Sequence, residues 1–280
     1  MKLTPSVLNL DFSEIETKIT RFIKEYVANS QMEGVVLGLS GGIDSATVAA
    51  LCSKALGNSN VFALLLPEME TKDQKDIDDA KTSAKQFNIK TQTIDITSAL
   101  EGIYNTIPVF NKKNQTSKGN IKARTRMLIL YYYANKLNKI VCGSSDKSET
   151  LMGYFTKWGD GAADMSPIMD LYKTQVRKLA INIGIPEAIA LKPSTPALWP
   201  NQSAEKELGI KYETLDLILY GLERFMTTKE IANQLNIEQN TVEIVKNRLM
   251  NNEHKRQLTI VPKLSFRTIG SDFRLPRQKY

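Results

Sequence analysis

The chain has 280 residues, of which 42% are hydrophobic and 24% charged, and these ordinary proportions exclude an intrinsically disordered chain. No apolar run approaches the roughly 20 residues of a membrane span, and the N-terminus lacks a signal core, so we expect a cytoplasmic protein without membrane contact. The net charge of +7 is concentrated between Lys255 and Tyr280, where seven residues are basic and one is acidic. The nearly neutral body does not favour general nucleic-acid binding.

Hydrophobic periodicity predicts short strands that alternate with helices along the first half of the chain. An amphipathic helix is predicted first, at residues 12–27. Strands are then predicted at 35–39, 61–66, 91–96 and 139–142. Further helices are predicted at 45–56, 73–87, 98–106 and 123–137. This alternation is typical of an α/β fold in which crossover helices cover a parallel sheet.

Two polar stretches, 111–120 and 193–207, have no periodicity and are predicted to be loops. Three helices are predicted beyond the second loop, at 212–225, 228–235 and 241–250. We therefore expect a single domain over residues 1–280. It would consist of an α/β core over about 1–195, followed by C-terminal helices and a tail over about 196–280.

The sharpest functional signal is a six-residue turn, S-G-G-I-D-S, between a predicted strand and a predicted helix. The backbone N–H groups of such a turn converge on one spot, which suits a polyanion such as pyrophosphate. Asp44 would repel a phosphate unless a divalent cation lay between them, so its presence implies Mg²⁺. A simple helix cap is the alternative interpretation of a serine–glycine turn. The predicted phosphate-site residues are Gly38, Leu39, Ser40, Gly41, Gly42, Ile43, Asp44 and Ser45.

This turn resembles the S-G-G-x-D-S loop of the PP-loop, or N-type ATP pyrophosphatase, superfamily. Its members cleave ATP to AMP and pyrophosphate and activate a carbonyl or carboxyl oxygen by adenylation. The resemblance implies the adenine nucleotide alpha-hydrolase-like fold, a three-layer structure with a parallel sheet between helices. The turn alone does not choose among the members, which include NAD synthetases, GMP synthetases and tRNA-modifying enzymes.

Later stretches resemble the NAD synthetases in particular. Residues 118–127, 143–149 and 153–164 are similar, in order, to the segments G-N-x-x-A-R-x-R-M, G-T-x-x-x-x-E and G-[FY]-x-T-K-[YWF]-G-D-G-x-x-D of that family. An E-H-K-R element at 253–256 follows, and the tail is most like that of archaeal-type members. The resemblance covers residues 12–277. It implies that deamido-NAD is amidated by ammonia at the expense of ATP, through an NAD-adenylate.

The family pattern assigns residues to ATP and to the metal. Asp44 and Glu149 are expected to share Mg²⁺ at the carboxyl ends of two parallel strands, where α/β sheets bind ligands. Ser144 and Thr195 match ATP-contacting positions of the family. Lys173 is expected to supply a fixed positive charge for the triphosphate.

The same pattern assigns residues to the second substrate and implies a homodimer. Asp160 is a candidate for positioning or deprotonating ammonium, although its two flanking glycines suit a tight turn equally well. The dinucleotide would lie at the subunit interface, and the helix at 123–137 has apolar residues on more than one face, as a helix packed on a partner needs. An ordinary buried helix would show the same pattern. The residues assigned to deamido-NAD are Arg124, Lys157, Asp164, His254 and Lys255.

Two other functions stay open at this stage. Residues 228–250 resemble a helix-turn-helix, although the second helix carries only two basic residues against one acidic residue, which is a thin face for DNA. The second is a tRNA-modifying PP-loop enzyme. Thiolating members use cysteines that are often close in sequence, whereas Cys52 and Cys142 lie in separate apolar segments.

Overall fold

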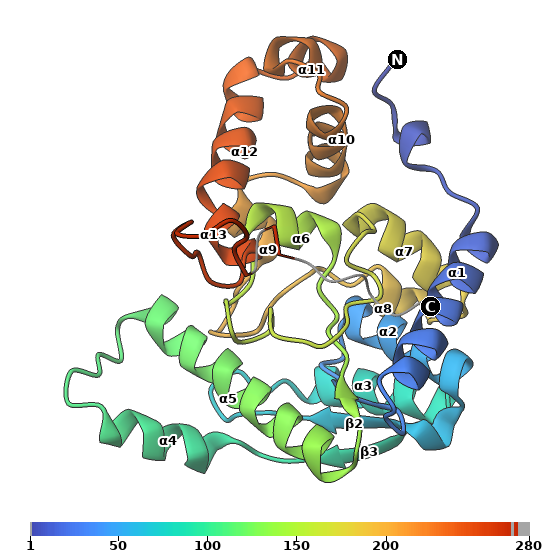
Figure 1. Cartoon of the computed structure of the whole chain (residues 1–280), viewed down its shortest axis with the longest axis vertical. Coiled ribbons are helices and arrows are strands. Elements are labelled where there is room, and N and C mark those ends of the chain that lie inside the picture. The colour runs from blue at the N-terminus through green and yellow to red at the C-terminus, as the bar shows by residue number, and fades with distance from the viewer. Residues whose placement is uncertain (1, 270–271, 274–280) are drawn as a thin grey trace.

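A parallel sheet of four strands forms the centre of the α/β part of the molecule, in the lower half of Figure 1. The computed structural model describes residues 2–269 and 272–273. The strand order is β3-β2-β1-β4, so the two strands in the middle are β1 and β2. In the register, Val35 pairs with Val61 on one side and with Ile140 on the other. The strands are β1 (Val35–Gly38), β2 (Val61–Leu65), β3 (Lys90–Thr93) and β4 (Ile140–Val141).

Helices cover both faces of the sheet, as the alternation of strands and helices predicts. Alternate side chains of β1 point to opposite faces, so Val35 and Leu37 contribute to one buried cluster and Val36 to another. The first cluster is formed with α1 (Phe12–Asn29), α2 (Ile43–Leu56), α3 (Gln74–Gln86) and α7 (Lys173–Asn182). The second is formed with α4 (Thr97–Thr106) and α5 (Gln115–Lys136). The expected three-layer α/β architecture is confirmed.

A third buried cluster belongs to the C-terminal helices, at the top of Figure 1. Leu3 and Leu8, near the start of the chain, pack into this cluster together with residues of the last third of the chain. This interleaving supports the single-domain division that we propose. The remaining elements are α6 (Lys147–Met152), α8 (Glu187–Ala190), α9 (Ala204–Leu208), α10 (Tyr212–Glu223), α11 (Thr228–Leu235), α12 (Gln239–Asn251), α13 (Glu253–Arg256), η1 (Pro5–Leu8) and η2 (Asn58–Asn60).

Two predicted loops are partly helical. The stretch 111–120 was expected to be a loop, but α5 begins at Gln115 after Asn114, whose side chain accepts a hydrogen bond from the Ser117 N–H. The prediction was wrong because α5 begins with four polar residues followed by Gly119, so its start shows no apolar periodicity. The stretch 193–207 is irregular only as far as Ser203, and α9 begins at Ala204.

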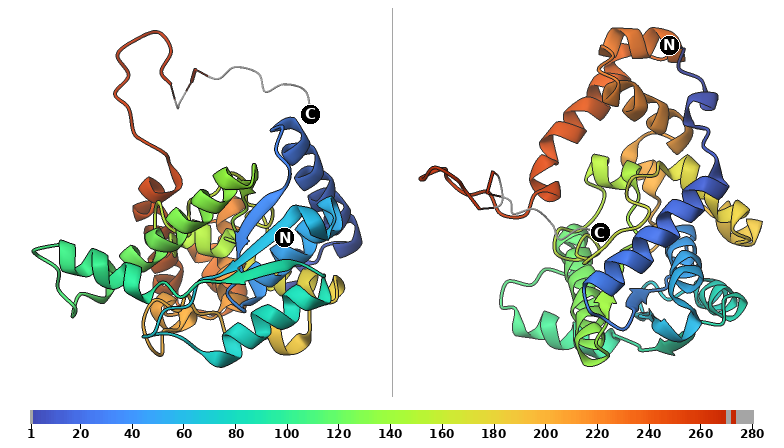
Figure 2. Two further views of the ribbon diagram at one scale, coloured as in Figure 1. Left: turned by 90° about the horizontal axis from the view of Figure 1, so that it is seen from below. Right: turned by 45° about the vertical axis from the view of Figure 1, so that its right-hand side comes forward.

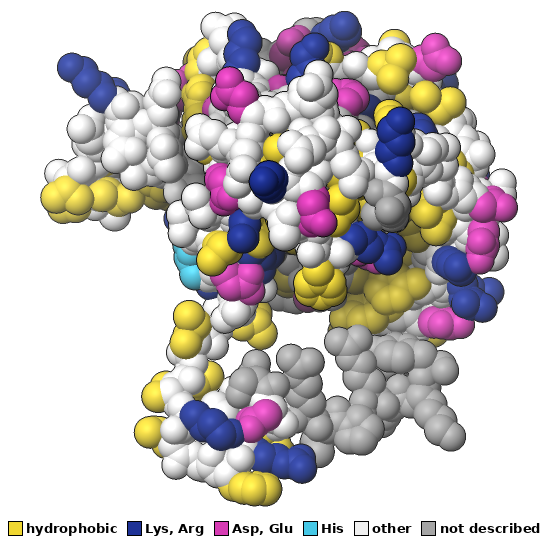
Figure 3. Space-filling view, turned by 90° about the horizontal axis from the view of Figure 1, so that it is seen from above, with side chains coloured by type: hydrophobic (Ala, Val, Ile, Leu, Met, Phe, Trp, Pro, Cys, Tyr) yellow, Lys and Arg dark blue, Asp and Glu magenta, His cyan; other side chains and the backbone are white. Residues whose placement is uncertain are grey.

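The segment after α13 leaves the body of the molecule, as both views of Figure 2 show. Its hydrophobic side chains are solvent-exposed, with Leu264 at 88% and Phe266 at 89%. Figure 3 shows hydrophobic and basic side chains beside one another where the chain protrudes. Part of the basic tail predicted from the sequence, including Arg274 and Arg277, lies outside the described residues. Within the described part of the chain, no helix is long and apolar enough to cross a membrane.

Candidate active site

The strand order places a switch point between β1 and β4. The chain proceeds outward from β1 to β2 and β3, and then returns to add β4 on the opposite side of β1. Crossovers on the two sides therefore diverge, which opens a crevice at the carboxyl ends of β1 and β4. The turn at residues 40–45 follows β1 and the segment 143–149 follows β4, so both predicted phosphate and metal segments meet at this crevice.

The turn after β1 is held by its own side chains. The hydroxyls of Ser40 and Ser45 lie 3.1 Å apart, and Ser45 Oγ also donates to the Gly42 carbonyl oxygen at 3.1 Å. The helix α2 begins at Ile43, and its N-cap, Gly42, has no side chain to satisfy the first N–H groups. These N–H groups and the positive end of the helix dipole are left available for an anion.

Gly41 is required by the geometry of this turn. Its φ is +82°, a value that favours glycine, and a Cβ built on it would lie only 2.1 Å from the carbonyl oxygen of Asp76. The turn therefore packs directly against the backbone of α3. A side chain at position 41 would push the phosphate-binding turn away from this support.

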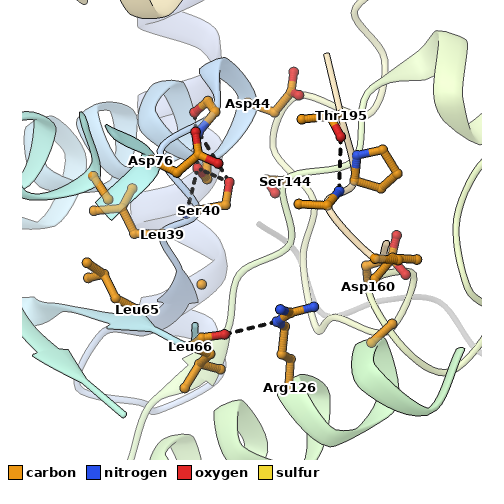
Figure 4. Close-up of a pocket in the computed structure, with 18 of the residues that line it drawn as sticks. Leu39, Ser40, Asp44, Leu65, Leu66, Asp76, Arg126, Ser144, Asp160 and Thr195 are labelled. Atoms are coloured by element: carbon orange, nitrogen blue, oxygen red, sulfur yellow. Dashed lines mark hydrogen bonds between the residues drawn. The ribbon is translucent and has the colours of Figure 1, made fainter. Parts of the chain in front are cut away.

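A cavity of about 330 Å³ opens in front of the turn (Figure 4). Its walls come from the turn, the carboxyl end of β2, the segment after β4, the face of α5 around Arg126, and residues 192–198. Most of the predicted ATP-site residues line it: Gly38, Leu39, Ser40, Gly42, Ile43, Asp44, Ser45, Ser144 and Thr195. Gly41 and Lys173 do not line the cavity, because Gly41 packs on α3 and Lys173 is fully buried.

Three carboxylates converge beside the turn. One oxygen each of Asp44, Asp146 and Glu149 lie within 4.8 Å of one another. The Lys173 ammonium lies 2.7 Å from Asp44, 2.7 Å from Asp146 and 2.8 Å from Glu149. Asp146 is a member that the sequence analysis missed, and only the convergence of two strand ends reveals it. One buried ammonium among three carboxylates leaves an excess of negative charge.

The pKa values of the cluster reflect this excess. Burial, together with the negative charge of Asp146, raises the pKa of Glu149 to about 8, although Lys173 acts in the opposite direction. Burial also raises the pKa of Asp146. The buried Asp44 Oδ1 has no hydrogen-bond partner among the residues that the structure describes. Carboxylate oxygens with unmet charge and unused lone pairs fit a hard cation such as Mg²⁺.

A buried aspartate of α10 supports the cluster from behind. Asp216 accepts hydrogen bonds from the Ser148 hydroxyl at 2.5 Å and from the Thr174 N–H at 2.9 Å. Ser148 Oγ in turn accepts from the Lys173 N–H at 2.9 Å. The start of α7, and with it Lys173, is thereby fixed to α6, which carries Glu149.

Arg126 and Asp160 lie together at the other side of the cavity (Figure 4). Arg126 Nε donates to the Leu66 carbonyl oxygen at 3.1 Å. Asp160 accepts from the Thr156 N–H at 2.9 Å, and desolvation raises the pKa of its carboxyl. Asp160 thus lines the cavity and its carboxylate also closes a turn. Both predicted roles, acting on ammonium and forming a tight turn, are therefore compatible with its position. Arg126 lies within the family-like segment 118–127, but its cavity position was not predicted.

Four of the residues assigned to deamido-NAD gather around the segment 153–158, and none of these four lines the cavity. Arg124 donates to the Lys157 carbonyl oxygen at 3.2 Å, and Lys157 Nζ donates to the His254 carbonyl oxygen at 2.6 Å. Lys255 Nζ donates to two carbonyl oxygens of the same segment at 2.8 and 2.9 Å. These contacts join α13 to the segment and to α5.

Asp164 has different contacts from the other four residues. Its Oδ2 accepts from the Val141 N–H at 2.7 Å, and its Oδ1 accepts from the Tyr131 hydroxyl at 3.2 Å. These bonds tie the end of β4 to α5. In this structure the side chain of Asp164 therefore supports the sheet edge.

The sequence and the architecture are similar to those of known proteins. The family model described as NAD synthase matches residues 15–259. The NH(3)-dependent NAD(+) synthetase of Pyrococcus furiosus is 44% identical over 91% of this chain and 96% of its own length. Two solved structures match this chain over their whole length, and each match spans 91% of this chain. One is the NH3-dependent NAD synthetase from Campylobacter jejuni with nitrate ion (34% identity, TM-score 0.76), and the other the NMN synthetase from Francisella tularensis (33%, 0.81). The chain belongs to the NAD synthase family.

Proposed function

We propose that this chain catalyses the ATP-dependent amidation of deamido-NAD by ammonia, which yields NAD, AMP and pyrophosphate. The observation that carries the proposal is the cavity at the switch point. This cavity is lined by the glycine turn at 40–45, which is suited to a pyrophosphate, and by Glu149, which carries a carboxylate. Membership of the NAD synthase family supports the choice of the substrates.

The turn would hold the pyrophosphate part of ATP. Residues of the turn and of the N-terminus of α2 line the cavity, and Ser144 and Thr195 would contact the nucleotide from the segments opposite. Asp44, Asp146 and Glu149 would hold Mg²⁺, which when bound supplies the positive charge that phosphoryl transfer requires. Lys173 would act on the phosphates indirectly, because its ammonium lies among these carboxylates and fixes their positions.

The reaction would proceed in two displacements. A carboxylate oxygen of the nicotinate attacks the α-phosphorus of ATP, and the bond to pyrophosphate breaks, which leaves an NAD-adenylate. The nitrogen of ammonia then attacks the acyl carbon, AMP leaves, and the nitrogen loses a proton. Asp160, a cavity carboxyl with a raised pKa, would position ammonium or accept that proton. Arg126 would add a fixed positive charge at the same side.

The dinucleotide would be bound by the residues gathered around the segment 153–158, with a homodimer completing the site. Arg124, Lys157 and Lys255 are the cationic members of this group, and an anionic dinucleotide needs such charges. The outer face of α5 exposes Leu128 at 64% and Tyr132 at 61%, which supports a subunit interface there. Asp164 and His254 remain proposed dinucleotide contacts.

The assay that tests the proposal is mass-spectrometric detection of NAD from deamido-NAD, ATP, Mg²⁺ and ammonium. NAD, AMP and pyrophosphate should appear in equal amounts, and omission of ATP or of ammonium should stop the reaction. Glutamine in place of ammonium should not support it, because Cys52 and Cys142 are buried and cannot act as amidase nucleophiles. Absence of NAD from the complete mixture would contradict the proposal.

Nicotinic acid mononucleotide is a second candidate substrate, because the Francisella tularensis protein with a TM-score of 0.81 is described as an NMN synthetase. The same chemistry would convert this acid into its amide. Comparison of kcat/KM for the mononucleotide and for deamido-NAD decides between them. We expect deamido-NAD to be preferred, because relatives at 44% identity are NAD synthetases.

The alternatives raised by the sequence are not favoured by these relatives. The helix pair α11–α12 buries Val242 and Val245 in the C-terminal cluster, which is the role of structural support. The free, buried thiols of Cys52 and Cys142 support a reducing compartment, and we propose the cytoplasm.

A further inference from the structure

The ammonium group of Lys122 joins two walls of the cavity that are distant in the sequence. Lys122 lies in α5 and is fully buried. Its Nζ donates to Glu68 Oε1 and to Glu70 Oε2, each at 2.7 Å, and to the Leu198 carbonyl oxygen at 2.9 Å. An ammonium has three N–H donors, and each of them has an acceptor here. We call these contacts the Lys122 junction.

Both of the joined segments face the cavity. Glu68 lines it from the segment after β2, and residues 192–198 line it from a segment distant in the sequence. We call residues 192–199 the strap. The strap contains Thr195, the proposed ATP contact, and has no helix or strand of its own. Its position therefore depends on contacts with other residues. At its start Lys192 Nζ bonds two aspartates of α3 at 2.5 and 2.6 Å, and the Ser194 carbonyl oxygen accepts from the Ala204 N–H at 3.1 Å.

The packing of α5 against the strap is a separate observation. A Cβ built on Gly119, one turn before Lys122, would lie 3.1 Å from Leu198 Cβ and 3.2 Å from a ring carbon of Trp199. On the following turn of α5, Arg126 donates to the carbonyl oxygen of Leu66. Residues three and four apart share one face of a helix, so this face of α5 contacts the strap, the junction and the end of β2 in succession.

The glutamates of the junction are held in their charged form. Burial alone would raise the pKa of Glu68, but hydrogen bonds from Lys122 and Thr71 outweigh it, and the net pKa is lowered. Glu68 is 4% exposed, so its charge depends on these donors. Loss of the Lys122 ammonium would leave a carboxylate buried without its counter-charge and the Leu198 carbonyl without its donor.

We propose that Lys122 is a positioning residue for the nucleotide, which acts by holding the strap against the cavity through the Leu198 carbonyl. Lys122 does not line the cavity itself, so its effect on binding passes through the strap and Glu68. The identity of the nucleotide as ATP rests on the proposed function. The placement of the strap does not, and it can be measured without any substrate.

The first test compares Lys122→Met with Lys118→Met. Lys118 also forms an ion pair with Glu70 at 2.7 Å, but within the described residues it makes no hydrogen bond to the strap, so it is a matched control. In the ligand-free protein, hydrogen exchange of residues 194–199 should become faster in Lys122→Met and stay unchanged in Lys118→Met. Unchanged exchange of the strap in a folded Lys122→Met protein would overturn the proposal.

The second test separates positioning from stability. Lys122→Met alone leaves Glu68 charged and buried, and is expected to lower the melting temperature. The double variant Lys122→Met with Glu68→Gln removes that charge and should regain much of the stability, but it cannot restore the bond to Leu198. We therefore expect the KM for ATP to stay raised by roughly tenfold in the double variant, with less than twofold change for deamido-NAD.

The outcomes of the second test are distinct. A raised KM for ATP alongside a recovered melting temperature supports the positioning role. Recovery of both in the double variant would show that Lys122 only balances a buried charge, and would overturn the proposal. Wild-type protein without NAD synthesis would instead contradict the proposed function, and the exchange of the strap would still decide the role of Lys122.

Discussion

The ammonium of Lys173 lies 2.7 Å from a carboxylate oxygen of Asp44, although 129 residues separate them in the sequence. Asp44 lies in the first turn of α2, after β1, and Lys173 begins α7, which packs on the same face of the sheet. This bond joins the phosphate-binding turn to the carboxylates of Asp146 and Glu149 that follow β4. The nucleotide turn and the candidate metal site are therefore one electrostatic unit.

Asp44→Asn should abolish NAD synthesis and leave the fold intact. The substitution removes one proposed metal ligand, and charge neutralisation contributes most to phosphoryl transfer, so we expect kcat to fall by about 100-fold or more. The melting temperature should not fall, because the cluster already holds excess negative charge. Asp170→Asn is the control, since its carboxylate is 98% exposed and pairs with Lys147 outside the cluster. Turnover close to wild type in Asp44→Asn at saturating Mg²⁺ would refute the metal assignment.

Lys173→Met should destabilise the protein strongly. It removes the fully buried ammonium and leaves the Asp44, Asp146 and Glu149 carboxylates to repel one another, at a cost of about 3–5 kcal/mol in the free energy of unfolding. Urea unfolding monitored by circular dichroism measures this quantity. The further change Asp146→Asn should recover part of the loss. A loss below about 1 kcal/mol would mean that the ammonium is not the counter-charge of the cluster.

Gly41→Ala should damage the nucleotide turn, whereas Gly57→Ala should not. The two glycines have φ angles of +82° and +81°, but an added Cβ would meet the Asp76 backbone at position 41 and nothing within 4 Å at position 57. Both variants carry backbone strain of about 1–3 kcal/mol. Only Gly41→Ala should also raise the KM for ATP, by about tenfold or more. An equal rise of the KM for ATP in both variants would mean that ATP binding does not depend on the close contact between Gly41 and α3.

Stability should fall between about pH 4 and pH 6 because of Asp216. Burial raises its pKa from 3.8 to about 6, although hydrogen bonds from Ser148 and Thr174 oppose the shift. The folded protein therefore retains a proton that the unfolded chain releases, so this stabilisation is full below pH 4 and is lost as the pH rises through 6, by up to about 3 kcal/mol. Asp216→Asn should remove this part of the pH profile. Identical profiles for both proteins in chemical unfolding would contradict the shift.

Arg124→Ala should weaken the binding of deamido-NAD more than that of ATP. The guanidinium lies at the segment 153–158 and outside the cavity lining, and loss of a charge-assisted contact corresponds to about a tenfold rise in KM. Initial rates with each substrate varied in turn provide the comparison. An equal rise in both KM values would mean that the two substrates do not bind in separate places.

Features of the candidate site that depend on adjacent residues could be predicted from the sequence, whereas contacts between distant segments could not. The turn at 40–45 was predictable because a strand, a glycine pair and a helix start follow one another directly. The roles of Asp146 and Lys122 were not predictable, because a charged residue in a sequence is normally expected at the surface. Only the folded chain shows that the buried ammonium groups of Lys173 and Lys122 each have three acceptors, and that Asp146 is one of them. The start of α5 at Gln115 escaped prediction because its first turn is polar on all sides.

The packing of Leu3 and Leu8 into the C-terminal cluster has a consequence for how the protein emerges during synthesis. The Leu3 N–H donates to the side chain of Gln234 at 2.6 Å, across 231 positions of the sequence. The apolar side chains of Leu3 and Leu8 therefore cannot be covered until the segment around Gln234 has been synthesised. Until then Leu3 and Leu8 remain exposed, and during this interval chaperones would have the most apolar surface to protect.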